Sequence, residues 1–245
     1  MSKRKYIEER RKKDQRQTRL MLGLIMGGLV LVIGGITMAF INTTNVNISG
    51  GQIIKSETNI TAQAERNGLG DPNAPVIIED YSDFGCSHCA DFALETKKLL
   101  EEEYINNGDV YLIFHSVGGM LGSSATFKAA EGAYCAADQD AFWPYHDLLF
   151  ANQVKLFQNP SADISRSLES FAEVLELNLD QFKSCLDDGK YIDLVTQDEI
   201  DARQKGITGT PTILVNGVLL RGNQPYENFQ QVINEALLNT GELTL

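Results

Sequence analysis

An apolar run, Val76 to Ile78, continues into Glu79, Asp80 and Tyr81, and this stretch of 76–81 predicts a strand. The stretch 87–106 predicts a helix, and 110–117 predicts a second strand. Asn107, Gly108 and Asp109 supply the stop and the turn between them. Such a strand–helix–strand unit places its reactive groups at the carboxyl end of a strand, where open α/β sheets have their sites.

A long helical pattern follows over about 122–205. Asp163 and Asp180 are the predicted N-terminal caps of its third and fourth helices. Its second helix is rich in aromatic residues, which favours core packing for Trp143 and His146. The predicted helices lie near 122–138, 141–153, 163–177, 179–188 and 190–204.

The end of the chain returns to strands. Residues 212–215 and 218–220 flank Asn216 and Gly217, a strong signal for a two-residue hairpin turn. Residues 226–239 place their apolar side chains on one face, which predicts a last amphipathic helix.

The most apolar stretch lies near the start of the chain. Residues 20–41 contain no charge, and at about 1.5 Å per residue they are long enough to span a bilayer. The basic segment 1–19 precedes them, which favours a single-pass anchor in the cell membrane with a cytoplasmic N-terminus. A cleaved signal peptide is the alternative, but its apolar region is typically only about 7–15 residues long.

The charge of the chain is divided unevenly. Residues 1–19 contain nine Lys or Arg residues and three acidic residues, which give a net charge of +6. Because the whole chain has a net charge of −12, the remaining residues carry −18. The acidic part is not expected to bind nucleic acid. The basic segment favours the anionic cytoplasmic face of the lipid bilayer. Residues 42–66 are polar and without a sustained period, and they predict a flexible linker to a folded domain at 67–245.

Two thiols, Cys86 and Cys89, stand at the predicted start of the helix. Residues three apart on a helix share one face, so the pair can close into a disulfide and open again. The helix N-terminus favours an anion, which lowers the pKa of the first thiol and populates the nucleophilic thiolate. His88 lies between them, and its imidazole would lower that pKa further if protonated. The expected chemistry is thiol–disulfide exchange, in which Cys86 attacks and Cys89 resolves.

Two other interpretations of the C-x-x-C pair are open. It could be half of a zinc site, but no second such pair completes four ligands. It could also be an inert structural disulfide, although a strand-to-helix position is unusual for one.

Two separated motifs carry a resemblance to a known family. The segment from Tyr81 to Cys89 resembles the active-site segment of the DsbA-like branch of the thioredoxin superfamily. The segment 206–217 is similar to that family's second signature, a cis-proline loop that faces the dithiol. The resemblance covers roughly 67–245, and it implies an α/β thioredoxin fold with an inserted helical subdomain at about 122–205, preceded here by one transmembrane helix.

The resemblance also implies roles for residues outside the dithiol. Pro211 would form the cis peptide bond, and Thr210 would offer its backbone groups to an incoming peptide; an ordinary trans proline is the alternative. In the resembled family an acidic residue six positions before the first cysteine shuttles a proton to the resolving cysteine. Asp80 holds this position on the face of the strand that Val76 and Ile78 share, whereas Glu79 or Asp83 could be the acting residue instead.

One position departs from the family pattern. Family members often carry proline directly after the first cysteine, and here it is Ser87. The redox potential therefore cannot be carried over, although His88 favours an oxidising couple because it would stabilise the reduced thiolate.

The other two cysteines, Cys135 and Cys185, lie inside the helical block and lack C-x-x-C spacing. An even count beyond a membrane favours a structural disulfide between them. Two buried free thiols are the alternative.

These observations predict a membrane-anchored, extracytoplasmic thiol–disulfide oxidoreductase that introduces disulfides into reduced exported proteins. It needs no cofactor beyond the Cys86–Cys89 disulfide and no metal. The resemblance implies a membrane quinone-linked thiol oxidase as the partner that restores the disulfide.

Two alternatives remain at this point. One is a reductase or isomerase on the same fold, which a measured reduction potential would separate from an oxidant. The other is a non-enzymatic, tethered copper-binding module that uses Cys86, His88 and Cys89 as soft ligands.

Overall fold

The computed structural model describes residues 47–48, 51–54, 64–121, 123–157 and 164–242. Within this part of the chain, no helix combines the length and the apolar character needed to cross a bilayer. The predicted anchor and the basic segment before it lie outside the described residues.

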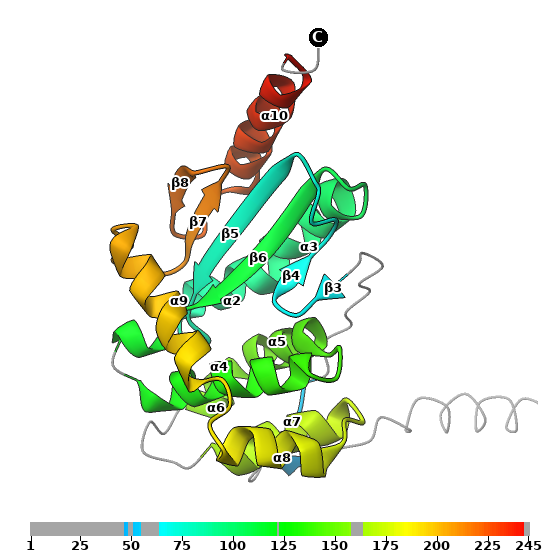
Figure 1. Cartoon of the computed structure of the whole chain (residues 1–245), viewed down its shortest axis with the longest axis vertical. Coiled ribbons are helices and arrows are strands. Elements are labelled where there is room, and N and C mark those ends of the chain that lie inside the picture. Colours follow the sequence, from blue (N-terminus) through cyan, green and yellow to red (C-terminus); the bar gives the residue numbers. More distant parts are fainter. Residues whose placement is uncertain (1–46, 49–50, 55–63, 122, 158–163, 243–245) are drawn as a thin grey trace, which may run out of the picture. The chain divides into compact units, whose positions relative to one another are not determined.

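A six-stranded sheet forms the centre of the domain, with the strand order β3-β4-β6-β5-β7-β8 (Figure 1). β5 and β6 run parallel, as the predicted strand–helix–strand unit requires, and β7 runs antiparallel to β5. The strands are β3 (Ala64–Glu65), β4 (Gly68–Leu69), β5 (Val76–Ser82), β6 (Val110–Ser116), β7 (Thr212–Val215) and β8 (Val218–Arg221).

The alternation of β5 decides which of its side chains face the main core. Val76, Ile78 and Asp80 are all buried, at 0%, 0% and 2% exposed. Because successive residues of a strand point to opposite faces, these three share one face, and Tyr81 lies on the other. Tyr81 belongs to a smaller apolar cluster with Leu214. Asp80 is therefore a carboxyl on the apolar face of a central strand.

The predicted helix 87–106 is present as one helical run that ends at Ile105. It consists of α2 (Ser87–Asp91), a π-helical segment (Phe92–Thr96), α3 (Lys97–Leu100) and a second π-helical segment (Glu101–Ile105). The sequence pattern did not indicate these π-helical segments, which depend on one extra residue per turn.

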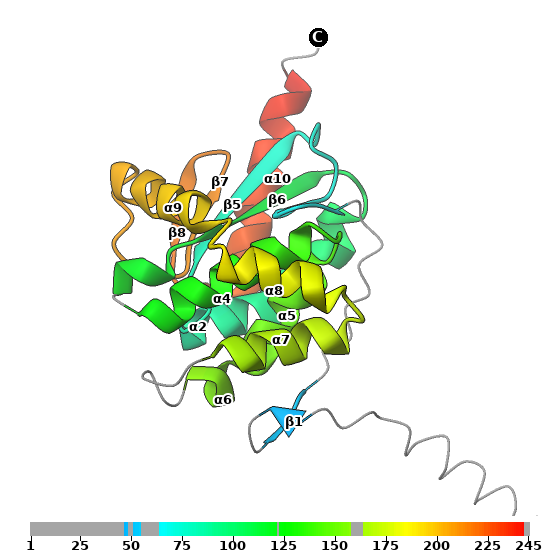
Figure 2. The same cartoon turned by 60° about the horizontal axis from the view of Figure 1, so that its bottom comes forward.

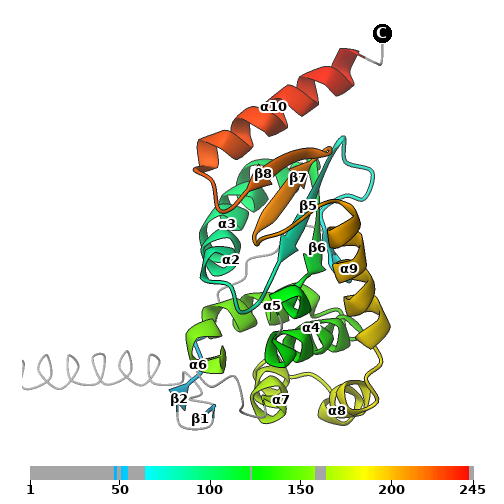
Figure 3. The same ribbon diagram turned by 90° about the vertical axis from the view of Figure 1, so that its left-hand side faces the viewer.

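Helices cover both faces of the sheet. Figure 3 shows α9 (Ile192–Gln204) along one face, and α2, α3 and α10 (Tyr226–Glu242) along the other. Phe92 and Phe229 bring the active-site helix and α10 together, with ring centroids 5.6 Å apart.

The helical block between β6 and β7 confirms the predicted insertion in outline. α4 and α5 lie between the sheet and the pair α7 and α8 (Figure 1 and Figure 2). The block contains a short 3₁₀ helix (Gly118–Leu121), α4 (Ser124–Ala137), α5 (Phe142–Ala151), α6 (Gln153–Phe157), α7 (Ser165–Val174), α8 (Leu179–Asp187) and α9.

One predicted helix cap is wrong and another is not described. Asn178, not Asp180, caps α8, because its side chain accepts a hydrogen bond from the backbone N–H of Gln181 at 3.0 Å. Asp180 lies in the first turn, where its charge still suits the helix dipole. The N-cap of α7 is Ile164, and Asp163 lies outside the described residues.

The aromatic residues of α5 pack in the core, as predicted. His146 is fully buried among Phe84, Phe114 and Phe150. Trp143 is 1% exposed and donates its indole N–H to the carbonyl of Gly68 at 2.9 Å. The indole thus binds the sheet to the helical block.

A buried ionic cluster joins the active-site helix to α5. The Lys97 side chain is 1% exposed, and its Nζ lies 3.3 Å from Oδ1 of Asp147. Lys97 also pairs with Glu101, one turn further along the same helix. Charges inside a protein are tolerated only when they are paired, so these three residues hold the two helices in one relative position.

A disulfide joins Cys135 of α4 to Cys185 of α8, with the two Cα atoms 5.8 Å apart. The structure therefore contains the predicted disulfide and not two free thiols. Both half-cystines are buried inside the helical block.

The folded domain begins earlier than the predicted boundary at residue 67. Ile53 is 8% exposed, and the backbone of Ile54 exchanges two hydrogen bonds, of 2.8 and 2.9 Å, with the side chain of Asn152. Two short strands, β1 (Asn47–Ile48) and β2 (Gly51–Gln52), pair with each other. The described residues of the predicted linker 42–66 are therefore ordered in part, and stretches of two to four residues are too short to show a period in the sequence.

Candidate active site

The loop after β5 delivers Cys86 to the start of α2. Cys86 is the N-cap residue in extended conformation, with φ −87° and ψ 123°. Its carbonyl accepts the backbone N–H of Cys89 at 3.1 Å and that of Ala90 at 3.2 Å. The sulfur of Cys86 therefore lies beside the unpaired N–H groups of the first helical turn, which favour a negative charge.

The two cysteines are free thiols with unequal surroundings. Cys86 is partly exposed, whereas Cys89 is fully buried. The pKa of Cys86 is lowered to about 5, chiefly because the Cys89 thiol donates a hydrogen bond to its sulfur. The Thr210 side chain and the backbone N–H groups of Cys89 and His88 add to this effect, which outweighs partial burial. Cys86 is thus a thiolate at neutral pH.

The second sulfur behaves in the opposite way. Burial first, and then the hydrogen bond it gives to Cys86, raise the pKa of Cys89 far above its ordinary value. The negative charge of Asp80 raises it further. The backbone N–H of Asp83 approaches this sulfur at 3.5 Å. Cys89 therefore holds its proton, and a thiolate there would be a poor leaving group.

Of the three candidate carboxyls, Asp80 is the one whose charge acts on Cys89. Burial raises its pKa to about 7, although the hydroxyl of Ser82 donates a hydrogen bond to it. An acid with this pKa is present in both protonation states at neutral pH and can give or take a proton. Glu79 instead pairs with Lys205 at the surface.

Asp83 lies on the Cys86 side of the dithiol. Its carboxylate accepts the backbone N–H of Gly85 at 2.9 Å, which shapes the loop. Burial raises its pKa, and the charge of Cys86 adds to the shift. The structure thus separates two buried carboxyls, one acting on each sulfur.

The imidazole of His88 is not placed as the sequence analysis expected. Its side chain is 73% exposed, and its Nδ1 lies 3.6 Å from Oδ2 of Asp91. His88 lowers the pKa of Cys86 through its backbone N–H. The reason is helical geometry, since a residue three further along shares the face of His88, whereas Cys86 lies two positions back.

The second motif meets the first across the fold. The peptide bond between Thr210 and Pro211 is cis. The sulfur of Cys86 lies 3.5 Å from the carbonyl oxygen of Thr210, a residue 124 positions away. Pro211 is buried, and its carbonyl accepts the backbone N–H of Gly222 at 2.8 Å. The loop that carries Thr210 is therefore anchored to β8 and borders the nucleophile.

Sequence reasoning missed Gln153, a buried residue at the start of α6. Its side-chain amide donates hydrogen bonds to the carbonyls of Phe84 at 2.7 Å and Cys86 at 2.8 Å. It thereby fixes the active-site loop to the helical block. A glutamine at a helix start carries no signal of such a role, because both acceptors lie far away in the sequence.

His115, near the end of β6, has a packing role. Its ring stacks on Tyr81 with centroids 4.5 Å apart, and its Nδ1 lies 2.9 Å from Asp198. No cluster of three His, Cys, Asp or Glu side chains suited to a metal ion occurs in the described part of the chain.

Comparisons with known proteins agree with this geometry. A family model described as thioredoxin (Thioredoxin_4) matches residues 63–235. The "Probable disulfide bond formation protein D" of Bacillus cereus is 27% identical over 218 residues, which cover 88% of this chain and 95% of that protein. The crystal structure of Wolbachia pipientis α-DsbA1 superposes with a TM-score of 0.66 at 25% identity, over 73% of this chain and 94% of that one.

A third relative is much longer than this chain. The "Na(+)/H(+) antiporter NhaA 3" of Salinispora tropica is 34% identical over 157 residues, which are 64% of this chain but only 22% of that protein. The likeness to the Wolbachia protein bears out the predicted α/β thioredoxin fold with a helical insertion. From the matched family and from relatives that cover nearly the whole domain, the chain belongs to the thioredoxin family and is a DsbA-like thiol–disulfide oxidoreductase.

Proposed function

We propose that this protein is a membrane-anchored oxidant that introduces disulfides into reduced exported proteins outside the cytoplasm. One observation carries the direction of the reaction, namely the lowered pKa of Cys86. A thiolate that is stabilised in the reduced protein makes the disulfide form the stronger oxidant, because oxidation removes that stabilisation.

The reaction begins with the Cys86–Cys89 disulfide. A substrate thiolate attacks the sulfur of Cys86, so a mixed disulfide forms and the Cys86–Cys89 bond breaks. The electron pair goes to Cys89, whose raised pKa demands a proton. Asp80, with a pKa of about 7, is the buried acid that supplies it.

The second step releases the product. Another thiolate of the substrate attacks the substrate sulfur of the mixed disulfide, and Cys86 leaves as a thiolate. Its low pKa makes it a good leaving group. The substrate gains a disulfide and the protein has accepted two electrons, which a membrane quinone-linked thiol oxidase would remove to restore Cys86–Cys89.

The location is proposed from the sequence. The uncharged stretch 20–41 behind the basic segment 1–19 supports a single-pass anchor with a cytoplasmic N-terminus, which holds the catalytic domain outside. Exported proteins that still carry free thiols are the substrates available there.

The alternatives of the sequence analysis differ in what supports them. A reductase or isomerase would use the same sulfurs, so only the potential separates it from an oxidant. A copper-binding module would need Cys86, His88 and Cys89 to converge on one ion. The burial of Cys89 and the 73% exposed His88, paired with Asp91, favour the redox assignment instead.

The reduction potential of the full-length protein tests the direction. Equilibration against glutathione buffers is expected to give a value near the strong-oxidant end, about −120 mV, rather than about −270 mV as in a reductant. The Cys86→Ser variant is expected to lose all oxidation of a reduced substrate. A potential near the lower value would make the protein a reductase.

The acidity of Cys86 is tested by its alkylation rate. In the reduced protein the rate with iodoacetamide is expected to rise with pH around a midpoint near 5 and to stay level above it. Cys89→Ala removes the largest cause of the shift, so its midpoint is expected to move upward. An equal midpoint in both proteins would show that the Cys89 thiol does not stabilise the thiolate.

The burial of Asp80 is tested by the pH dependence of stability. Its folded pKa of about 7 lies above the ordinary 3.8, so folding retains a proton that the unfolded chain loses. The resulting loss of folding stability grows as pH rises from the unfolded pKa to the folded pKa of Asp80, and it is constant above the folded pKa. Asp80→Asn removes it, so urea denaturation should show a gain of up to about 4 kcal/mol at pH 8 that vanishes near pH 4.

Glu95→Gln is the control, because it neutralises an exposed carboxyl on the active-site helical run, away from the buried face of β5. Its effect is expected to be small and similar at both pH values. A gain for Asp80→Asn that does not depend on pH would contradict the raised pKa.

The anchor is tested by membrane fractionation and mass. The full-length protein is expected in the membrane fraction after carbonate extraction, with residues 1–41 still present in its mass. A chain without 20–41 is expected to be released from the membrane fraction. A mature mass that lacks the apolar stretch would instead establish a cleaved signal peptide.

A further inference from the structure

A small hollow lies beside the cis-proline loop, whose residue Thr210 borders the reactive sulfur. It has a volume of about 160 Å³ and is lined by Thr208, Gly209, Thr210, Pro211, Thr212, Arg221 and Gly222. Since a molecule of liquid water takes about 30 Å³, the space suits one short polar side chain. The carbonyl of Thr210, one of its walls, lies 3.5 Å from the sulfur of Cys86.

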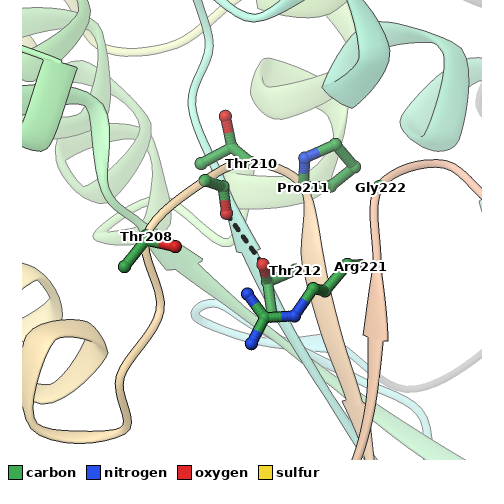
Figure 4. Close-up of a pocket in the computed structure, with 7 residues that line it drawn as sticks. Thr208, Thr210, Pro211, Thr212, Arg221 and Gly222 are labelled. Carbon is green, nitrogen blue, oxygen red and sulfur yellow. Dashed lines mark hydrogen bonds between the residues drawn. The ribbon is translucent and has the colours of Figure 1, made fainter.

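Arg221 gives this hollow its chemical character. In Figure 4 the Arg221 side chain extends from β8 toward Thr212, and Thr208 lies on this same side of the loop. Thr212 and Arg221 are cross-strand partners, which explains why the two side chains share one face of the sheet. Arg221 is exposed and forms no ion pair with any described residue.

Several other cations of this domain differ from Arg221 in this respect. Most of its other described Lys and Arg side chains are neutralised within the fold. Ion pairs with carboxylates are formed by Lys97, Lys128, Lys183, Lys190, Arg203 and Lys205. The chain beyond residue 19 carries a net charge of −18, so acids are abundant in the sequence, yet no acid of the described residues forms an ion pair with Arg221.

The hydroxyls around the hollow also differ in what they can bind. The Thr212 hydroxyl donates to the carbonyl of Gly209 at 2.7 Å and is thus engaged. The Thr210 side chain serves the Cys86 sulfur and points to the opposite side of the loop in Figure 4. Thr208 is exposed, and its hydroxyl faces the hollow. Arg221 and Thr208 together supply donors that no carboxylate of the described residues engages, and such donors bind a carboxylate.

We propose that Arg221 and Thr208 form a carboxylate-binding subsite, which selects protein segments with an aspartate or glutamate close to the cysteine that joins Cys86. The inference rests on the proposed function, because a segment bound through its sulfur to Cys86 passes the loop of Thr210. Long-range electrostatic attraction cannot produce this preference, since the net negative charge of the domain repels acidic ligands. The guanidinium acts locally, through a charge-assisted hydrogen bond.

Competition for a mixed disulfide tests the subsite. The full-length chain carrying Cys89→Ala retains a mixed disulfide on Cys86, because the resolving thiol is absent. Two single-cysteine peptides, identical except for Glu or Gln, exchange on it. The thiolate of the second peptide attacks the first peptide's sulfur in the mixed disulfide, so a disulfide forms between the two peptides and Cys86 leaves as a thiolate. The Cys86 thiolate then attacks the second peptide's sulfur in that disulfide and releases the first peptide as a thiolate. The number of disulfides is therefore conserved. Mass spectrometry gives the ratio of the two adducts at equilibrium.

The acidic residue is moved from three positions before the cysteine to three positions after it. At one or two of these positions the Glu peptide is expected to exceed the Gln peptide by about threefold to fivefold, as for an accessible ion pair. Arg221→Gln is expected to abolish the preference, and Arg221→Glu to replace it by a preference for Lys at the same position. High salt is expected to weaken it.

Lys183→Gln and Lys183→Glu are the charge-matched controls, because Lys183 lies on α8 and pairs with Glu169. They are expected to keep the wild-type ratio. Equal ratios in the Arg221 variants and the parent, or no preference at any position, would overturn the subsite while leaving the exchange reaction intact. If Cys86 formed no mixed disulfide with either peptide, the proposed function itself would fail and the subsite with it.

Discussion

The hydrogen bond between the two sulfurs is the interaction on which the chemistry of this protein depends. It makes one cysteine an accessible anion and the other a buried acid, although both belong to the same first turn of a helix. The lowered pKa of Cys86 depends chiefly on this hydrogen bond, whereas the raised pKa of Cys89 comes first from burial and is increased further by the hydrogen bond. The asymmetry gives the reaction its order, because Cys86 is both the atom that a substrate can reach and the thiolate that leaves most easily.

Three layers of the fold maintain that asymmetry. The central strand β5 places Asp80 on its apolar face, where burial gives the carboxyl a pKa near neutrality. The helical block contributes Gln153, whose side-chain amide donates hydrogen bonds to the carbonyls of Phe84 and Cys86 in the active-site loop. The cis-proline loop closes the site from the opposite side. The inserted helices are therefore part of the active site, because one of their side chains shapes the loop that carries Cys86.

Two clusters of polar groups lie inside the core. The ammonium group of Lys97 pairs with Glu101 in the same helical run and with Asp147 of α5, and Asp198 joins β6 to α4 through His115 and Tyr134. All of these contacts except Lys97–Glu101 join elements that are distant in the sequence. Such buried polar contacts tolerate little displacement, since a separated charge in an apolar core is very unfavourable, and they keep the dithiol and its loop in register.

Local pattern determined a large part of this structure before any contact was known. Alternation located β5 and the face that holds Asp80, helical spacing located most of the insertion, and two cysteines three residues apart could only meet on one helix face. These features depend on neighbours in the chain. The sequence alone left Asp80, Glu79 and Asp83 as rivals, assigned His88 to an interaction that its backbone provides instead, and gave no indication of Gln153 or Arg221. Local helical geometry decided the placement of His88. Tertiary structure decided the other points, because burial, the pKa shifts that follow from it and the contacts of Gln153 arise from residues brought together across more than sixty positions of chain.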